Sequence, residues 1–158
     1  MATYIHFSND VEGPCEKKNH EGWIEMDSWG WSCARELSGG NQVGLASGIA
    51  KFESLSFQAS IGSATIAMYQ KMLFGVHFDE VLIECTKNVG TEEPEPWLKI
   101  KLEHVLVVEI AQSIDSDTAA DDIKLAFSQV EVSIADQKKD GTLDTEKTFT
   151  YDLTTAVG

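Results

Sequence analysis

The sequence predicts an all-β fold: a compact β-barrel of two curled antiparallel sheets, with one short α-helix at about 63–74 and a long extended loop at about 38–48. Most apolar residues alternate with polar ones at a period of two, which is typical of strands with one buried face. Two apolar runs change parity partway, as strands do where a sheet bends into a barrel. The 158 residues contain no linker or internal repeat, so we expect a single domain over 1–158.

The alternation is clearest from Leu98 to Ile110, which predicts one long strand or two strands joined by a bend. His104 lies on the apolar parity of this run, so we expect a core histidine with its polar atoms satisfied. The segment 81–85 predicts another strand, and the alternation over 149–153 predicts a closing strand.

The two changes of parity predict where the sheet bends. Ile24 and Met26 share one parity, whereas Trp29 and Trp31 share the other. A second change falls within 123–134. Because a change of parity moves the apolar side chains to the other face, each one indicates a bulge or a sharp bend.

The single helical segment covers 63–74. Ser63 is a good N-cap, and Gly75 stands where a left-handed C-cap belongs. The face that we expect to pack on the core consists of Ile66, Tyr69 and Leu73, widened by Met68 and Met72.

Charge and cysteine content exclude several classes of partner. Twelve Lys and Arg face 26 Asp and Glu, a net charge of −14, so we expect no nucleic-acid binding and no direct membrane binding. The start, 1–8, has neither the basic nor the apolar region of a signal peptide. Cys15, Cys33 and Cys85 are too widely spaced for a disulfide framework, and the last two lie in apolar runs that suggest core positions.

Motifs that carry chemistry are missing from the sequence. It has no nucleophile elbow and no phosphate-binding glycine loop. Cys15 and His20 are five residues apart, and the other histidines are scattered, which does not form a zinc motif. The segment 115–122 lacks the glycine and glutamate of a calcium loop and is interpreted as a solvated acidic loop, while Asp140-Gly141 predicts a hairpin turn. We therefore expect no catalytic, cofactor-binding or metal-binding residues, and no enzyme.

The order of several short motifs resembles the Hcp family, the haemolysin-coregulated tube proteins of type VI secretion. The likeness runs from about Tyr4 to Leu153 and rests on order and spacing together. Its parts are the tryptophan-rich strand 23–32, the glycine-rich loop 38–48, Leu55-Ser56-Phe57, the helix 63–74, the strand 81–85, the I-x-L-x-x-V-L-V run 100–107 and the L-x-F-x-x-V-x-V run 125–132.

The resemblance implies a structural subunit without a cofactor. Six copies would close into a ring, rings would stack into a hollow tube inside a contractile sheath, and contraction would expel the tube with effectors in its lumen. The implied partners are further copies of the chain, sheath and spike proteins, and secreted effectors. The implied location is the bacterial cytoplasm during assembly, then the extracellular space or a target cell, reached without a signal peptide.

The glycine-rich loop is the candidate for ring stacking because it has no charge to repel the next ring. Its residues are Ser38, Gly39, Gly40, Asn41, Gln42, Val43, Gly44, Leu45, Ala46, Ser47 and Gly48. A loop without a stacking role remains the alternative for this segment. For the whole chain, the alternatives are a monomeric barrel that binds a small apolar ligand and a hydrolase on a β-scaffold. Within the family, a chaperone-carrier for a dedicated effector remains an alternative to a structural tube.

Overall fold

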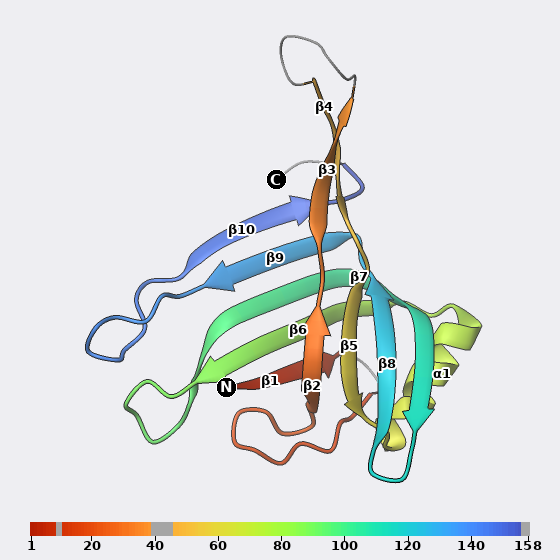
Figure 1. Ribbon diagram of the computed structural model, residues 1–158, viewed down its shortest axis with the longest axis horizontal. Helices are drawn as coiled ribbons and strands as arrows, with labels where there is room; N and C mark the ends of the chain where they lie inside the picture. The colour runs from red at the N-terminus through yellow and green to blue at the C-terminus, as the bar shows by residue number, and fades with distance from the viewer. Residues whose placement is uncertain (9–10, 39–45, 156–158) are drawn as a thin grey trace.

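The computed structural model describes residues 1–8, 11–38 and 46–155, and it confirms a mostly β fold with one short helix (Figure 1). The elements are β1 (Ala2–Phe7), β2 (Ile24–Gly30), β3 (Cys33–Ser38), β4 (Ala46–Phe52), β5 (Leu55–Ser60), α1 (Ser63–Phe74), β6 (Phe78–Lys87), β7 (Glu95–Ile114), β8 (Ala119–Ala126), β9 (Gln129–Ile134) and β10 (Lys147–Asp152).

Six of the strands form the closed barrel. The order β7-β6-β1-β2-β5-β8 returns to β7, because β8 also pairs with β7. β9 and β10 continue the sheet beyond the barrel, outward from β7. β3 and β4 pair with each other and project away from the barrel (Figure 1). The molecule is therefore a barrel with a sheet extension and a projecting hairpin.

The long strand β7 bends between the two sheets, as the alternation predicts. It pairs with β9 up to Glu103 and with β6 up to Val105, and from Leu106 it pairs with β8. His104 adopts a left-handed backbone with φ of 51° at this bend. Its side chain is exposed, so the expected core histidine is wrong: the bend turns it out of the alternation.

Both predicted parity changes correspond to real irregularities. In β2 the register with β5 shifts between Met26 and Ser28, which confirms a bulge there. The segment 123–134 is two strands rather than one, because β8 ends at Ala126 and β9 begins at Gln129. The chain leaves one sheet and enters the other at this break.

The helix has the predicted bounds, but a different face is buried. Gly62 rather than Ser63 is the N-cap, and Gly75 confirms the left-handed C-cap with φ of 65°. Thr65 and Met68 are the buried helix residues. Leu73, by contrast, is 72% exposed, so the predicted core face is wrong for this residue and for Ile66.

The cysteine prediction is confirmed in part, whereas the loop prediction is wrong at both ends of the segment 38–48. Cys85 is buried, whereas Cys33 is exposed, which corrects its expected core position. Ser38 pairs with Ala46 across the hairpin, so Ser38 and 46–48 belong to strands rather than to the expected loop. The rest of the stacking candidates, 39–45, lie outside the described residues.

One contiguous core fills the barrel. It takes side chains from all six barrel strands, from α1 and from β9. Its largest fully buried members are Phe7, Phe78, Ile5, Leu55, Met68, Ile83, Ile100, Leu102 and Leu125. Close packing of such side chains is the main term that stabilises a domain of this size.

Candidate assembly surfaces

A row of apolar side chains runs across the sheet and continues beyond the core. The register places Ile5, Ile83, Ile100, Val132 and Phe149 side by side on consecutive strands. The first four are buried, whereas Phe149 on β10 is 52% exposed. The barrel does not reach far enough to cover the end of this row, so an apolar surface stays open on β10.

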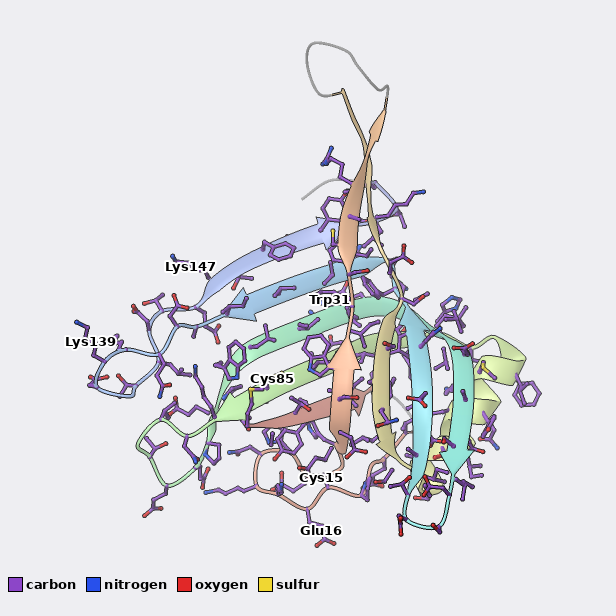
Figure 2. The ribbon with its side chains drawn as sticks, in the orientation of Figure 1. Cys15, Glu16, Trp31, Cys85, Lys139 and Lys147 are labelled. Atoms are coloured by element: carbon purple, nitrogen blue, oxygen red, sulfur yellow. The ribbon has the colours of Figure 1, made fainter. Side chains whose placement is uncertain are left out.

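An aromatic groove adjoins this open end. Trp31, labelled in Figure 2, lies at the base of the β3–β4 hairpin. Its ring centroid is 5.2 Å from that of Phe52, and the Phe52 centroid is 6.2 Å from that of Tyr151 on β10. The groove has a volume of about 360 Å³, and its lining is mainly apolar. We call the groove with its surroundings the β10 flank: Trp31, Cys33, Phe52, Ile134, Phe149 and Tyr151.

β10 also has a free edge among the described residues. It pairs with β9 from Lys147 to Asp152, and no described strand pairs with its other side. An unpaired edge presents backbone N–H and C=O groups that a strand of another molecule can bind. The β10 flank therefore combines exposed apolar side chains with open hydrogen-bonding capacity.

A second apolar surface lies on α1, on a different side of the barrel from β10 (Figure 1). Its residues, which we call the helix flank, are Ile66, Leu73, Phe74 and Val76. Apolar side chains that are exposed together, unlike single ones, mark sites of protein association. The two flanks differ in shape and composition, since one is a groove beside a strand and the other is a helix face.

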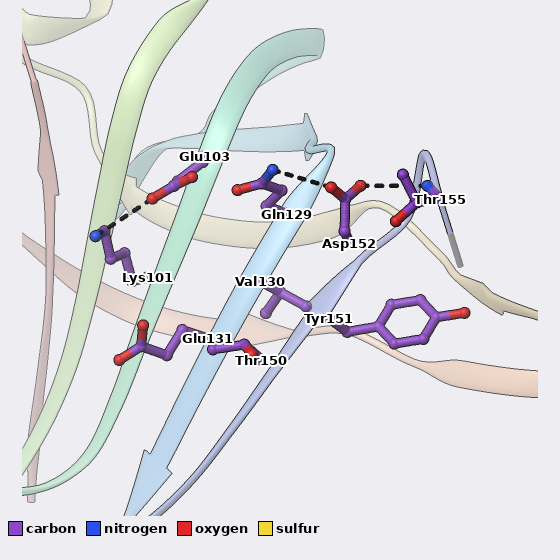
Figure 3. A pocket seen from close by; sticks show the side chains of 9 residues that line it. All are labelled: Lys101, Glu103, Gln129, Val130, Glu131, Thr150, Tyr151, Asp152 and Thr155. Carbon is purple, nitrogen blue, oxygen red and sulfur yellow. Dashed lines mark hydrogen bonds and ion pairs between the residues drawn. The ribbon is translucent and has the colours of Figure 1, made fainter. Parts of the chain in front are cut away.

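The outer face of β6, β7, β9 and β10 is charged. A shallow pocket of about 350 Å³ on this face is lined by Lys101, Glu103, Gln129, Glu131 and Asp152, among others (Figure 3). Lys101 Nζ lies 3.3 Å from Glu103 Oε1 and 3.6 Å from Glu80 Oε2. Gln129 donates to Asp152 at 3.0 Å.

The electrostatics of this face are those of stable ions in water. The hydrogen bond with Glu103 raises the pKa of Lys101 above its ordinary range. Hydrogen bonds from the Thr154 hydroxyl and backbone N–H hold the pKa of Asp152 below its ordinary range. Both contacts favour the charged form of the side chain on this exposed face.

Among residues 1–8, 11–38 and 46–155, no group of three or more His, Cys, Asp or Glu lies close enough together to hold a metal ion. Asp115 of the acidic segment instead accepts hydrogen bonds from the backbone of Asp117 and Thr118 and shapes a turn. Within the same ranges, no helix is long and apolar enough to cross a membrane.

Sequence reasoning missed both flanks. Phe149 and Tyr151 alternate with polar residues, which indicates a strand with one buried face. The alternation does not show whether the rest of the barrel extends far enough to cover that face. Ile66 and Leu73 have core-like helical spacing, and the same spacing fits a face that binds another molecule. Of the predicted stacking residues, Ser38 and 46–48 lie in the projecting hairpin, and the others fall outside the described residues.

Comparison with known families identifies the chain. A family model described as type VI secretion system effector, Hcp, matches residues 4–134. The chain belongs to the Hcp family. A secreted, structural tube role matches this family. Among curated proteins, a sequence comparison found no match.

Solved structures agree on the fold of this Hcp protein. A type six secretion system protein is similar at a TM-score of 0.90, with 21% identity over 99% of this chain and 98% of that one. Hcp1 from Salmonella typhimurium is similar at 0.80, with 20% identity and coverages of 98% and 96%. A type VI secretion system effector from Yersinia pestis is similar at 0.76, with 19% identity and coverages of 95% and 98%.

Proposed function

We propose that this Hcp protein is the structural subunit of a type VI secretion inner tube. Six copies close into a ring, and rings stack into a hollow tube in the bacterial cytoplasm. Contraction of the sheath, with the spike at the tip, expels the tube to the extracellular space or a target cell. Effectors travel in the lumen, and no signal peptide is needed.

The observation that carries this proposal is the pair of unlike apolar flanks on different sides of one barrel. A closed ring needs a heterologous interface, in which one surface of each copy meets a different surface of the next. Leu73 and its neighbours on the helix flank offer a convex apolar face, and Phe149 and its neighbours offer an apolar groove. Joining the two head to tail covers both.

The remaining surfaces fit stacking and transport. The β3–β4 hairpin projects away from the barrel (Figure 1), which supports a contact with a neighbouring ring in the proposed tube. Ser38 and 46–48 lie on this hairpin, so we retain the segment 38–48 as the stacking candidate. Neither flank includes the charged outer face of β6, β7, β9 and β10, which stays available to water or to an effector.

The test is negative-stain electron microscopy of the purified protein, together with its mass in solution from light scattering. We expect annular particles of six copies of 17.4 kDa each. Compact particles with the mass of one chain at high concentration would contradict the proposal and would favour the monomeric binding module.

Two variants test the interface itself. Leu73→Asp and Phe149→Asp each place a charge on one flank, and each is expected to abolish rings. In a mixture, the intact β10 flank of Leu73→Asp can bind the intact helix flank of Phe149→Asp. The mixture is therefore expected to form dimers but no rings. Val108→Asp is the matched control, because Val108 is an exposed apolar residue outside both flanks. Rings that survive both flank variants would exclude these surfaces.

A further inference from the structure

A cavity of about 320 Å³ lies at the end of the barrel beneath the first turns of α1. Its walls come from β2, β5, β8, α1 and the segment around Cys15. The apolar lining includes Ile24, Phe57, Ala59, Met68 and Ile123. Pockets that hold small molecules begin at about 300 Å³, so the cavity has the size of a binding site.

One carboxylate interrupts the apolar wall. The inward row of β8 runs from Leu125 through Ile123 and ends at Asp121, which is only 2% exposed and borders the cavity. Its Oδ2 accepts a hydrogen bond from the Thr65 hydroxyl at 2.5 Å, and its Oδ1 accepts one from Gln112 Nε2 at 2.8 Å. Both donors are neutral groups.

The hydrogen bond to Thr65 has a structural purpose, because it fixes α1 to the barrel end, and the helix N-terminus adds a partial positive charge. None of these contacts supplies a full positive charge. Burying a carboxylate without a positively charged partner costs free energy. The two oxygens of a carboxylate can also accept about four hydrogen bonds in total. Asp121 therefore retains capacity for a donor that approaches through the cavity.

The opposing wall leaves room for such a donor. Ala59 pairs with Asp121 across β5 and β8, and its small, buried side chain also borders the cavity. A larger side chain at this position would fill the space. At the rim, Glu25 is half exposed and already forms an ion pair with Lys17 at 3.2 Å, so the attraction for an entering ammonium comes from Asp121 rather than from the rim.

We propose that this barrel-end cavity binds a primary aliphatic ammonium group. The ammonium donates to Asp121, and the alkyl chain lies against Phe57, Met68 and Ile123. The same chemistry occurs in a free alkylamine and in the lysine side chain of a polypeptide. The inference goes beyond tube assembly and does not depend on it.

The test compares n-hexylammonium with 1-hexanol, which has the same chain but no charge, by calorimetry and ligand-observed NMR on the purified full chain. We expect the amine to bind at least tenfold more tightly than the alcohol. Asp121→Asn is expected to weaken amine binding at least tenfold and to leave the alcohol unchanged. Asp122→Asn is the matched control, since Asp122 is the neighbouring carboxylate on β8 and is exposed.

Ala59→Leu gives a second, independent measurement, because it fills the cavity while Asp121 remains. This substitution is expected to weaken the binding of both the amine and the alcohol. Near-UV circular dichroism checks that each variant is folded. Equal amine binding by the parent protein and Asp121→Asn would overturn the proposal. So would binding that Ala59→Leu leaves unchanged, or the absence of amine binding.

A third ligand, Nα-acetyl-lysine amide, separates the two sources. Binding that matches hexylammonium supports a lysine side chain as the natural occupant. Binding of hexylammonium alone supports a free amine, because the peptide groups then fail to fit at the rim. Either result supports the ammonium site, whereas failure of both ligands would exclude it.

Discussion

The Nε2 atom of His20 lies 2.7 Å from Oε2 of Glu84. The contact fastens the connection between β1 and β2 to the outer side of β6. His20 is 6% exposed, and its ring also stacks on Tyr4 at a centroid distance of 4.1 Å. A polar side chain this well enclosed needs a hydrogen-bond partner, and Glu84 supplies one, so the pair holds the connecting segment in place.

Replacing His20 by alanine is therefore expected to lower the free energy of unfolding by about 1–3 kcal/mol, because the stacking is lost and Glu84 loses its partner. Denaturant titration measures the effect. His77→Ala is the control, because His77 is exposed, and it should change stability by less than about 0.5 kcal/mol. Equal stability of the two variants would mean that the pair does not stabilise the fold.

Two apolar residues of α1, Met68 and Leu73, are expected to contribute very differently to the stability of the fold. Met68 is 1% exposed, so Met68→Ala is expected to cost about 2–5 kcal/mol. Leu73→Ala should cost less than about 0.5 kcal/mol, because its side chain contributes little to the core. Both are measured by denaturant titration in the Phe149→Asp background, so that folding is separated from association. A large cost at Leu73 in this background would restore the face predicted from the sequence.

Gly13 is tightly enclosed. A Cβ atom there would lie 2.3 Å from the Trp23 carbonyl oxygen, and the Gly13 N–H donates to the Gly22 carbonyl at 2.8 Å. Gly13→Ala is thus expected to destabilise the protein by about 1–3 kcal/mol in thermal or chemical unfolding. At Gly30 an added Cβ meets no atom within 4 Å, so Gly30→Ala should be nearly neutral. Similar losses in both variants would contradict this steric argument.

Acid stability depends in part on Asp115. Hydrogen bonds from the Asp117 and Thr118 backbone hold the pKa of Asp115 below its ordinary value of 3.8. Because the folded pKa is depressed, the contribution is complete above the ordinary pKa and is lost as pH falls through the folded one. Asp115→Asn should flatten the decline of stability below about pH 4, as followed by unfolding titrations at several pH values. Asp117→Asn serves as the control, and a decline unchanged by Asp115→Asn would contradict the prediction.

Ring stacking should respond to salt. Each copy has a formal charge of −14, so rings stacked as proposed would repel one another. Raising ionic strength from about 0.01 M to 1 M shortens the screening length from about 30 Å to 3 Å. Light scattering is expected to rise with salt and also near the pI of about 4.5. Scattering that falls steadily as salt increases would show that attraction between charges holds the stack together.

Much of the architecture follows from local patterns. The alternation predicts β6, β7 and β10. The predicted helix bounds 63–74 match α1, and Gly75 is the C-cap as expected, although the N-cap is Gly62 rather than Ser63. The parity change in β2 predicts its bulge. Such features depend on neighbours two to four residues away, so the order of residues contains them.

Local patterns fail where a feature depends on distant segments. His104 follows the apolar parity, yet the turn of β7 between two sheets exposes it. Cys33 lies in an apolar run, but its strand belongs to a hairpin that leaves the core. The cavity bordered by Asp121 is also invisible in the sequence, since Thr65 and Ala59 line it from two other elements and Gln112 contacts Asp121 from a third.

The sequence alone determined the all-β class, the single helix, the acidic surface and, through the order of its motifs, the likeness to Hcp proteins. Only the tertiary structure decided which apolar residues stay uncovered and which carboxylate is buried. The physical reason is that a period of two or 3.6 defines an apolar face, whereas the solvent exposure of that face depends on what packs against it. Phe149 and Leu73 have the pattern of core residues and the exposure of surface residues, and it is this difference that points to another copy of the chain.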